Sequence, residues 1–380
     1  MHDQIPFNMP TLVGLEFEFL REALERGHLS GNGSFTKRCH ALLQERLGAA
    51  RVLLTHSATA ALEMSAILAD IGPGDEVIMP SFTFCSTANA FVLRGAVPVF
   101  VEIRADTLNI NENAIEAAIT PRTRAICVVH YAGVAAQMDA IMEIATRHGL
   151  HVIEDAAQAL HANFRGKQLG SFGAAAAISF HETKNLISGE GGALIVNDPG
   201  WAERAEIIWE KGTNRAQFSR GEVARYTWVD IGSSFLPSEL TAAFLFAQLE
   251  AGQGVTEHRL AAWERYHAAV LPLEVQGLLR RPCVPQECAH NGHIYFVLVP
   301  DAARRDAALA AMTALGVNAV MHYVPLHSAP AGLRYGRAAG PLPITDELSA
   351  RLIRLPLYPR ITPGEQERVV AALARVLAPD

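Results

Sequence analysis

The sequence is poor in charge and in cysteine. Only 19% of its 380 residues are charged, and five are cysteines. So low a share of charge predicts extensive burial, in one large core or in two domains that share one. An odd number of cysteines without a Cys-x-x-Cys pair argues against a disulfide framework and predicts reduced thiols in a cytoplasmic protein.

Other absences exclude further classes of protein. No apolar run reaches about 18 residues, so no membrane-spanning helix is expected. The start, Met1–Phe7, lacks the basic and apolar regions of a secretory signal. The net charge of −7 gives no sign of binding to nucleic acid or to an anionic membrane. No metal site is predicted, and a ligand that carries phosphate would need a locally positive site.

Strands and helices alternate from Arg51 onward, after two amphipathic helices. The expected strands are Val52–Leu54, Val77–Met79, Val97–Glu102, Ala125–His130, His151–Glu154, Ala175–Phe180 and Ala193–Val196. The expected helices are Leu15–Arg26, Phe35–Leu47, Ala60–Leu68, Thr87–Leu93, Glu112–Ala118, Met138–His148 and Trp201–Lys211. This alternation predicts a parallel sheet with helices on both faces.

After about Gly254 the pattern changes to a smaller α+β unit. Its expected strands are His293–Leu298 and Asn318–Tyr323, and its expected helices are Ala303–Leu315 and Pro363–Leu377. The pair Thr362-Pro363 suits the N-cap and first position of the last helix. We predict two domains, residues 1–254 and 255–380, joined through the helices 236–249 and 255–271.

Lys184 is the most unusual residue, because it lies between two apolar strands. An unpaired ammonium is costly to bury. Desolvation, however, lowers the pKa of a lysine and frees its lone pair to attack a carbonyl carbon, which gives a Schiff base. The alternative is a loop lysine in solvent, where most lysines lie.

Two further segments favour the chemical interpretation. Asp155 follows the β-branched run His151–Glu154, where the crevice of a parallel sheet opens. The segment Ser57–Leu62 opens a helix directly after a strand. A lysine for the covalent link, an aspartate for a pyridinium nitrogen and a helix N-terminus for a phosphate are the groups that pyridoxal phosphate (PLP) requires.

These segments resemble those of the sugar aminotransferases of the DegT/StrS family, and the likeness covers nearly the whole chain. It is strongest over Phe91–Ala96, His130–Ala135, His181–Asn185, Glu210–Arg215 and Asp230–Ser234. The resemblance implies the type I PLP-dependent aminotransferase fold, like aspartate aminotransferase. That fold has a large domain with a mostly parallel sheet and helices on both faces, and a smaller C-terminal α+β domain.

The resemblance also implies a homodimer that uses PLP and its amine form, pyridoxamine phosphate. L-Glutamate would supply the amine, and a nucleotide-linked 4-ketosugar would receive it. Lys184 would hold the cofactor and then act as the proton shuttle. Asp155 would keep the ring nitrogen protonated, whereas Glu154 would point to the other side of the strand.

The phosphate is expected at the start of the helix that follows Ser57. The N–H groups of Ala58 and Thr59 would point at it, and the Thr59 hydroxyl would add a bond. The resemblance adds Ser179 to these phosphate ligands. For both hydroxyls the alternative is a hydrogen bond to the local backbone.

The resemblance assigns three more residues to the cofactor. Gln158 would lie near its ring hydroxyl, unless it is an amide on a helix surface. Phe84 would stack on its ring, with a plain core aromatic as the alternative and Phe82 as the rival. His181 would contact the cofactor or the sugar, or pack as a neutral core histidine.

One motif departs from the family pattern. Relatives often carry Gly-x-Asn-x-Arg, whose Asn reaches the cofactor phosphate of the neighbouring subunit; here Ser234 and Leu236 replace the Asn and the Arg. The shorter serine would contact the phosphate directly or through water. The neighbouring residues 211–215 would supply polar contacts or form a solvated loop. The loop Gly27–Ser34 would be a connector or a flexible edge of the sugar site, and His322-Tyr323 would lie at the edge of the site.

Three rival functions remain. A PLP-dependent sugar dehydratase of the same family would carry histidine in place of Lys184. A transaminase for another ketosugar, UDP-linked or with the ketone at C3, is closer to the expected function. A regulatory relative without turnover would keep the fold but has no need of Lys184 or Asp155.

Overall fold

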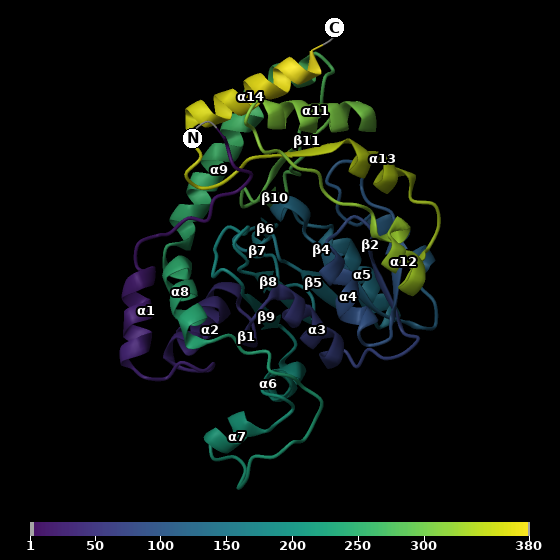
Figure 1. The fold of residues 1–380 in the computed structure, drawn as a ribbon. Coiled ribbons are helices and arrows are strands. Elements are labelled where there is room, and N and C mark those ends of the chain that lie inside the picture. Colours follow the sequence, from purple (N-terminus) through teal and green to yellow (C-terminus); the bar gives the residue numbers. More distant parts are fainter. Residues whose placement is uncertain (1–3, 379–380) are drawn as a thin grey trace.

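The protein is described from a computed structural model that covers residues 4–378; the outermost residues of the two predicted domains, 1–3 and 379–380, lie outside the described part. Its centre is an eight-stranded sheet in the order β1-β9-β8-β5-β4-β2-β3-β12 (Figure 1). The strands are β1 (Arg51–Thr55), β2 (Glu76–Pro80), β3 (Val97–Val101), β4 (Thr123–Val129), β5 (His151–Asp155), β8 (Ala175–Ser179), β9 (Gly192–Val196) and β12 (Arg337–Ala338).

The sheet is mostly parallel, as predicted, with one reversal. Strand β9 runs antiparallel to both of its neighbours, β8 and β1, while the remaining pairs are parallel. The reversal arises because β8 and β9 are joined by the short connection that carries Lys184. All seven predicted strands of this region are present; β12, from the C-terminal part of the chain, was not predicted.

Helices cover both faces of the sheet. One face packs against α1 (Glu16–Glu25), α2 (Ser34–Leu47), α5 (Met138–His148) and α8 (Glu239–Glu250). The other packs against α3 (Ala58–Leu68), α4 (Cys85–Val92) and α6 (Ala202–Trp209). Successive strand residues alternate between the two cores: Val52 and Leu54 belong to the first, and Leu53 to the second.

The C-terminal part is built on a two-stranded antiparallel sheet, β11 (Tyr295–Leu298) and β13 (Leu352–Leu355). Its helices are α9 (Gly252–Ala269), α10 (Leu271–Val275), α11 (Ala302–Ala314), α12 (Pro330–Tyr335), α13 (Pro343–Arg351) and α14 (Pro363–Leu377). Helix α14 begins as predicted, because Thr362 and Glu365 form a capping box. The domain division at residue 254 stays a prediction; β12 and Ile5, which packs in the C-terminal core, both cross it.

Two predicted elements are wrong. Residues 112–118 form two 3₁₀ turns, η1 (Glu112–Ala114) and η2 (Glu116–Ala118), instead of one helix. Their chief buried apolar anchor is Ile115, too little to hold an α-helix against the sheet. Residues 318–323 form one isolated bridge, Val320 to Arg354, because the chain then turns away to line a cavity.

Three features complete the fold. A small sheet contains β10 (Cys288–Ala289), β6 (Asn163–Phe164) and β7 (Lys167–Gln168). The segment 210–236, which contains α7 (Arg215–Ser219), projects away from the body of the molecule (Figure 1). No helix within residues 4–378 is long and apolar enough to cross a membrane.

Candidate active site

A cavity of about 510 Å³ opens where the parallel strands of the large sheet end. One wall comes from the starts of α3 and α4, the end of β5 and the connection between β8 and β9. The other comes from residues 320–323 and from β13. The cavity is lined by all the predicted site residues except Ser234: Ala58, Thr59, Phe84, Asp155, Gln158, Ser179, His181 and Lys184.

The start of α3 forms the end of the cavity that suits an anion. Ser57 caps the helix, and its hydroxyl accepts the N–H of Ala60 at 3.1 Å. The N–H groups of Ala58 and Thr59 belong to the first turn and have no partner inside the helix. Gly192 makes this geometry possible, because a Cβ there would lie 2.4 Å from the Ala58 nitrogen.

Hydroxyl groups add to this end of the cavity. The Thr59 and Ser86 hydroxyls lie 2.8 Å apart, and both residues line the cavity. Ser179 ends β8, and its Oγ accepts a long hydrogen bond from the His181 N–H at 3.4 Å. The local bond foreseen as the alternative for Ser179 therefore exists, although the residue still faces the cavity. Helix N–H groups and hydroxyls together suit a phosphate.

Asp155 is held rigidly at the end of β5. The Thr87 hydroxyl donates to its Oδ2 at 2.6 Å, and the Ala157 N–H donates to its Oδ1 at 3.2 Å. Thr87 in turn lies 2.8 Å from the Thr83 hydroxyl. The residue is 7% exposed and lines the cavity, so its carboxylate can accept a further hydrogen bond from a ligand.

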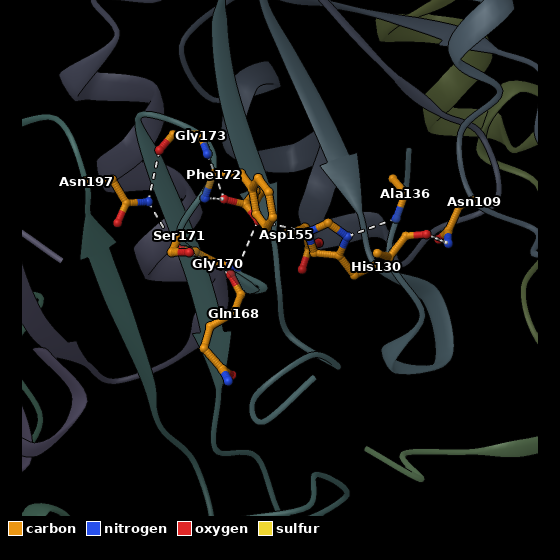
Figure 2. A network of polar contacts seen from close by, with 12 residues as sticks. Asn109, His130, Ala136, Asp155, Gln168, Gly170, Ser171, Phe172, Gly173 and Asn197 are labelled. Carbon is orange, nitrogen blue, oxygen red and sulfur yellow. Dashed lines mark hydrogen bonds and ion pairs between the residues drawn. The ribbon is translucent and has the colours of Figure 1, made fainter. Parts of the chain in front are cut away.

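Glu154 points to the other side of β5, as predicted from strand periodicity. Its carboxylate accepts the N–H groups of Gly170, Phe172 and Gly173 at 2.7, 2.7 and 2.8 Å. It also lies 3.0 Å from His130 Nε2; these four partners are labelled in Figure 2. His130 Nδ1 accepts the Ala136 N–H, so Nε2 carries the proton and donates. Burial alone would raise the pKa of Glu154, but these donors hold it below the usual value.

Gln158 is a buried bridge between two segments and does not lie on a helix surface. Its Oε1 accepts the Ala132 N–H at 2.7 Å, and its Nε2 donates to the Tyr323 hydroxyl at 3.0 Å. The turn at Ala132 continues through Gly133, which has φ = +76°. A side chain at this position would place its Cβ 2.1 Å from Asn291 Oδ1, so only glycine fits. The amide is thereby fixed beside the cavity; its contact with a ring hydroxyl stays a prediction.

The two candidate phenylalanines lie in different places. Phe84 is 58% exposed and lines the cavity. Phe82 is fully buried and packs against Tyr131 and Tyr323, with ring centroids 5.0 and 5.5 Å away. Phe84 is therefore the ring available for stacking on a ligand, and Phe82 belongs to the core.

Lys184 lies in the tight connection after β8, where its N–H donates to the His181 carbonyl oxygen. Burial lowers the pKa of its ammonium to about 8; Asp155 opposes this shift and Arg354 adds to it. At pH 7 roughly one such amine in ten is neutral, against fewer than one in 10³ for an ordinary lysine. Lys184 is thus prepared to act as a nucleophile and as a base.

His181 stands beside Lys184 and is not a core histidine, because its side chain is 40% exposed. Its Nδ1 accepts the Thr183 N–H at 3.2 Å, and the Thr183 hydroxyl lies 2.9 Å away. In the neutral ring Nε2 therefore carries the proton, 3.7 Å from Glu190 Oε1. The ring can donate a hydrogen bond to a ligand in the cavity.

Ser234 does not line the cavity of its own chain. It is exposed and pairs with Glu210 in an isolated bridge within the projecting segment 210–236. In the same segment Asn214 is buried, and its Oδ1 accepts the Thr227 N–H. Contact between Ser234 and a cofactor, directly or through water, therefore stays a prediction that requires a second subunit.

Sequence analysis missed several residues of the cavity. Arg354 and Phe7 form part of the second wall, with the guanidinium carbon 4.3 Å from the centre of the Phe7 ring. Arg354 Nη1 donates to His322 Nε2 at 3.1 Å. A lone arginine in the apolar run Leu352–Leu355 was the available signal for this site. No sequence signal indicated Thr87, because its partner Asp155 is 68 residues away.

The residues around the cavity fit PLP. The start of α3 suits its phosphate, Asp155 suits a protonated ring nitrogen, and Lys184 would supply the amine for the covalent link. Burial and, to a smaller extent, the charges of Arg354 and Lys184 together lower the pKa of His322 to about 2. The second wall therefore contributes neutral imidazole and one guanidinium.

Comparison with known proteins agrees with this geometry. Residues 11–374 match the model of the DegT/DnrJ/EryC1/StrS aminotransferase family. The aminotransferase TlmJ from Streptoalloteichus hindustanus is 31% identical, with 98% of each chain covered and a TM-score of 0.90. DesV from S. venezuelae, solved in complex with a ketimine intermediate, is 30% identical, with 99% of each chain covered and a TM-score of 0.89.

A third structure supports the fold alone. Spr1654 from Streptococcus pneumoniae, described as a putative sugar aminotransferase, is 23% identical over 98% of this chain and 98% of its own in its PLP form, with a TM-score of 0.90. It has also been solved in a PMP form. With the family match over nearly the whole sequence, the chain belongs to the DegT/DnrJ/EryC1/StrS family of PLP-dependent aminotransferases.

Proposed function

We propose that this aminotransferase converts dTDP-4-keto-6-deoxy-D-glucose into dTDP-4-amino-4,6-dideoxygalactose, with L-glutamate as the amino donor. The observation that carries amine transfer is the placement of Lys184, Asp155 and the start of α3 around one cavity. The choice of sugar is supported by the sequence resemblance over His181–Asn185, Lys211–Arg215 and Gly232–Ser234.

Bound PLP supplies an electron sink for the carbon that bears the amine. Lys184 would take the proton from that carbon in the amino donor and return a proton to C4 of the sugar, a task that suits an amine with a pKa of about 8. Asp155 keeps the proton on the ring nitrogen, and Phe84 excludes water from one face of the ring. The face of C4 that meets Lys184 decides whether the new amine is axial, as in the galacto product, or equatorial.

Nucleotide choice should be less strict than sugar choice. Thymine differs from uracil by one methyl group, which is worth roughly 1–3 kcal/mol, a 10- to 200-fold preference at best. We expect UDP-linked sugars to react more slowly than dTDP-linked ones. We also propose a cytoplasmic location, which the five free cysteines support.

We further propose that the active unit is a homodimer, in which residues 215–234 of one subunit, within the projecting segment 210–236, complete the cavity of the other. Ser234 does not line the cavity of its own chain, and Trp228 in the same segment is 79% exposed. Such an exposed indole suits a protein interface. A mixture of Lys184→Ala subunits with Ser234→Asp subunits tests this, because each mixed dimer would regain about one complete site.

Recovered activity in the mixture supports the dimer, since each variant alone would be weak. The Lys184→Ala subunit lacks the amine, and a carboxylate at position 234 would repel the partner's phosphate. If mixed dimers form but no activity returns, each subunit builds its own site.

One assay tests the proposed reaction. The holoenzyme is incubated with L-glutamate and a panel of dTDP- and UDP-linked ketosugars, and the product is identified by NMR. We expect the 4-amino sugar with an axial amine from the dTDP-linked 4-ketosugar. An equatorial amine as the main product, or faster turnover of a 3-ketosugar, would contradict the choice of sugar but not amine transfer. Failure of glutamate to bleach the bound cofactor would favour a regulatory relative.

A further inference from the structure

His293 is a buried histidine that lines the cavity in the same wall region as Lys184. It lies two residues before β11 and is 2% exposed. The groups that suit the cofactor do not include it. A buried imidazole has two ring nitrogens, and each needs a partner that matches its role as donor or acceptor. The partners of His293 therefore show what its ring can offer to the cavity.

Asn185 decides which ring nitrogen of His293 carries the proton. The Asn185 side-chain Nδ2 donates to the Asn291 carbonyl oxygen at 2.9 Å, which leaves Oδ1 as an acceptor. This Oδ1 lies 2.9 Å from His293 Nδ1, so Nδ1 carries the proton and donates. Burial, and then the charge of Lys184, lower the pKa of His293 well below its usual value. The ring is therefore neutral, and its Nε2 presents a lone pair.

A network of buried amides holds this ring in place. Asn291 is 1% exposed; its Nδ2 donates to the carbonyl oxygens of Gln158 and Leu160 at 2.8 and 2.9 Å, and its Oδ1 accepts the His293 N–H at 3.1 Å. With Asn185, this network ties His293 both to the segment after β5 and to the connection between β8 and β9. A ring fixed in this way loses little further freedom when it binds a partner.

Lys184 is the group of the wall that suits the lone pair of His293. The titratable and charged groups that face His293 are Lys184, Arg354, Arg259 and His322. Arg354 already donates to His322, and Arg259 donates to backbone carbonyl oxygens. The Lys184 amine, in contrast, makes no side-chain hydrogen bond within residues 4–378. Its ammonium form carries three N–H donors and needs acceptors in so buried a place.

The position of this amine matters once it is no longer linked to the cofactor. A lysine side chain has four rotatable bonds, so a free amine must be restrained to stay beside the reacting carbon. A misplacement of about 1 Å can cost roughly 10²-fold in rate. An acceptor that holds one N–H of the ammonium also fixes the direction in which the other two point.

We propose that His293 is a positioning residue for Lys184: its Nε2 accepts a hydrogen bond from the ammonium that Lys184 forms when it takes the proton from the amino donor. The imidazole neither gains nor loses a proton, and the proton stays on Lys184 until Lys184 passes it on. The inference rests on the proposed function, because it concerns the proton that Lys184 carries there.

Two substitutions separate the two nitrogens of His293. The amide of His293→Asn lies about where Nδ1 stands, so it can keep the bond to Asn185 but cannot reach Lys184. The amide of His293→Gln lies about where Nε2 stands, and its oxygen can accept from Lys184. The control is His290→Asn, three residues earlier and outside the cavity. His290 Nδ1 accepts the Gly292 N–H, a bond that the asparagine can keep.

The first measurement is made on the apoenzyme. Labelling with an amine reagent over a range of pH, followed by peptide mapping, gives the pKa of Lys184. In His293→Asn this pKa should fall by roughly 0.5–1 unit, because the ammonium loses an acceptor that favours it. In His293→Gln and His290→Asn it should stay within about 0.3 unit of wild type. An unchanged pKa in His293→Asn, or an equal fall in His293→Gln, would contradict the proposal.

The second measurement follows the bleaching of the bound cofactor by L-glutamate and by glutamate deuterated at C2. His293→Asn should slow bleaching about 10- to 100-fold and raise the deuterium isotope effect, without changing the glutamate concentration that gives half the maximal rate. His293→Gln should recover most of the rate, and His290→Asn should match wild type.

Three outcomes would overturn the inference. Equal losses in His293→Asn and His293→Gln, with equally lowered melting temperatures, would assign His293 a structural role. A loss confined to the reaction with the ketosugar would make Nε2 a sugar ligand. Bleaching of His293→Asn at the wild-type rate would show that Lys184 does not need the imidazole. If glutamate fails to bleach even the wild type, the proposed function itself fails.

Discussion

Strand β5 ends in two adjacent carboxylates that serve opposite sides of the sheet. Asp155 lines the cavity, where Thr87 and Ala157 orient it but leave it accessible to a ligand. Glu154 is fully buried on the other side of the strand, where three backbone N–H groups and His130 surround it. The same chemical group is therefore open to a ligand on one side of the strand and joins loops together on the other.

Two phenylalanines repeat this contrast two residues apart. Phe84 is largely exposed at the cavity, and Phe82 is buried against Tyr131 and Tyr323. In both pairs the side that a residue faces decides whether its loss should affect activity or stability. Substitutions matched within each pair can test that rule.

Matched amides at the end of β5 should give the largest contrast. Asp155→Asn should lower kcat by on the order of 10²-fold or more, because the ring nitrogen loses its charged partner. Glu154→Gln should lower the free energy of unfolding by about 3 kcal/mol, because buried donors lose a charged acceptor. The measurements are kcat on the holoenzyme and urea unfolding of the apoenzyme. Near-normal turnover of Asp155→Asn would refute its role.

Leucine in place of each phenylalanine should separate the second pair. Phe82→Leu should cost about 1–2 kcal/mol of stability through the cavity that it leaves in the core. Phe84→Leu should change stability by less than about 0.5 kcal/mol but weaken cofactor binding roughly 2- to 10-fold through lost stacking. Unfolding and cofactor titration measure the two effects. Equal cofactor affinity of Phe84→Leu and wild type would show that Phe84 does not stack on the cofactor.

The last of these predictions concerns pH. Burial lowers the pKa of Lys184 to about 8, and only its neutral form attacks an aldehyde. The rate at which PLP rebinds covalently to the apoenzyme should rise about tenfold per pH unit below 8 and level off above it. Arg354 contributes to the lowered value, so Arg354→Gln should move the midpoint upward. A wild-type rate that still rises steeply above pH 9 would show that the pKa of Lys184 is that of an ordinary lysine.

The sequence alone indicates one wall of the cavity far better than the other. Lys184, Asp155 and the start of α3 each stand in a contiguous strand or helix signal, so local periodicity was enough to single them out. The contacts that fix residues of the cavity join positions far apart in the sequence: Gln158, for example, donates to Tyr323, 165 residues away. A sequence pattern shows that a residue is unusual but not which residue it meets.

The errors in the predicted fold have the same origin. Residues 318–323 have strand-like composition, yet the chain leaves β13 after one bridge and places His322 and Tyr323 in the cavity wall. Arg354 stands in an apolar strand, and only the folded structure shows that its charge lacks a partner. The position of Ser234 depends on a second subunit, which no pattern within one chain can place.

The central claim is that the cavity is organised around a covalent link between PLP and Lys184. Borohydride reduction of the holoenzyme makes that link permanent, and peptide mapping by mass spectrometry then locates it. We predict the pyridoxyl mass on the peptide that contains Lys184, and its absence after prior treatment with L-glutamate. The same mass on any other lysine, or none at all, would contradict the account.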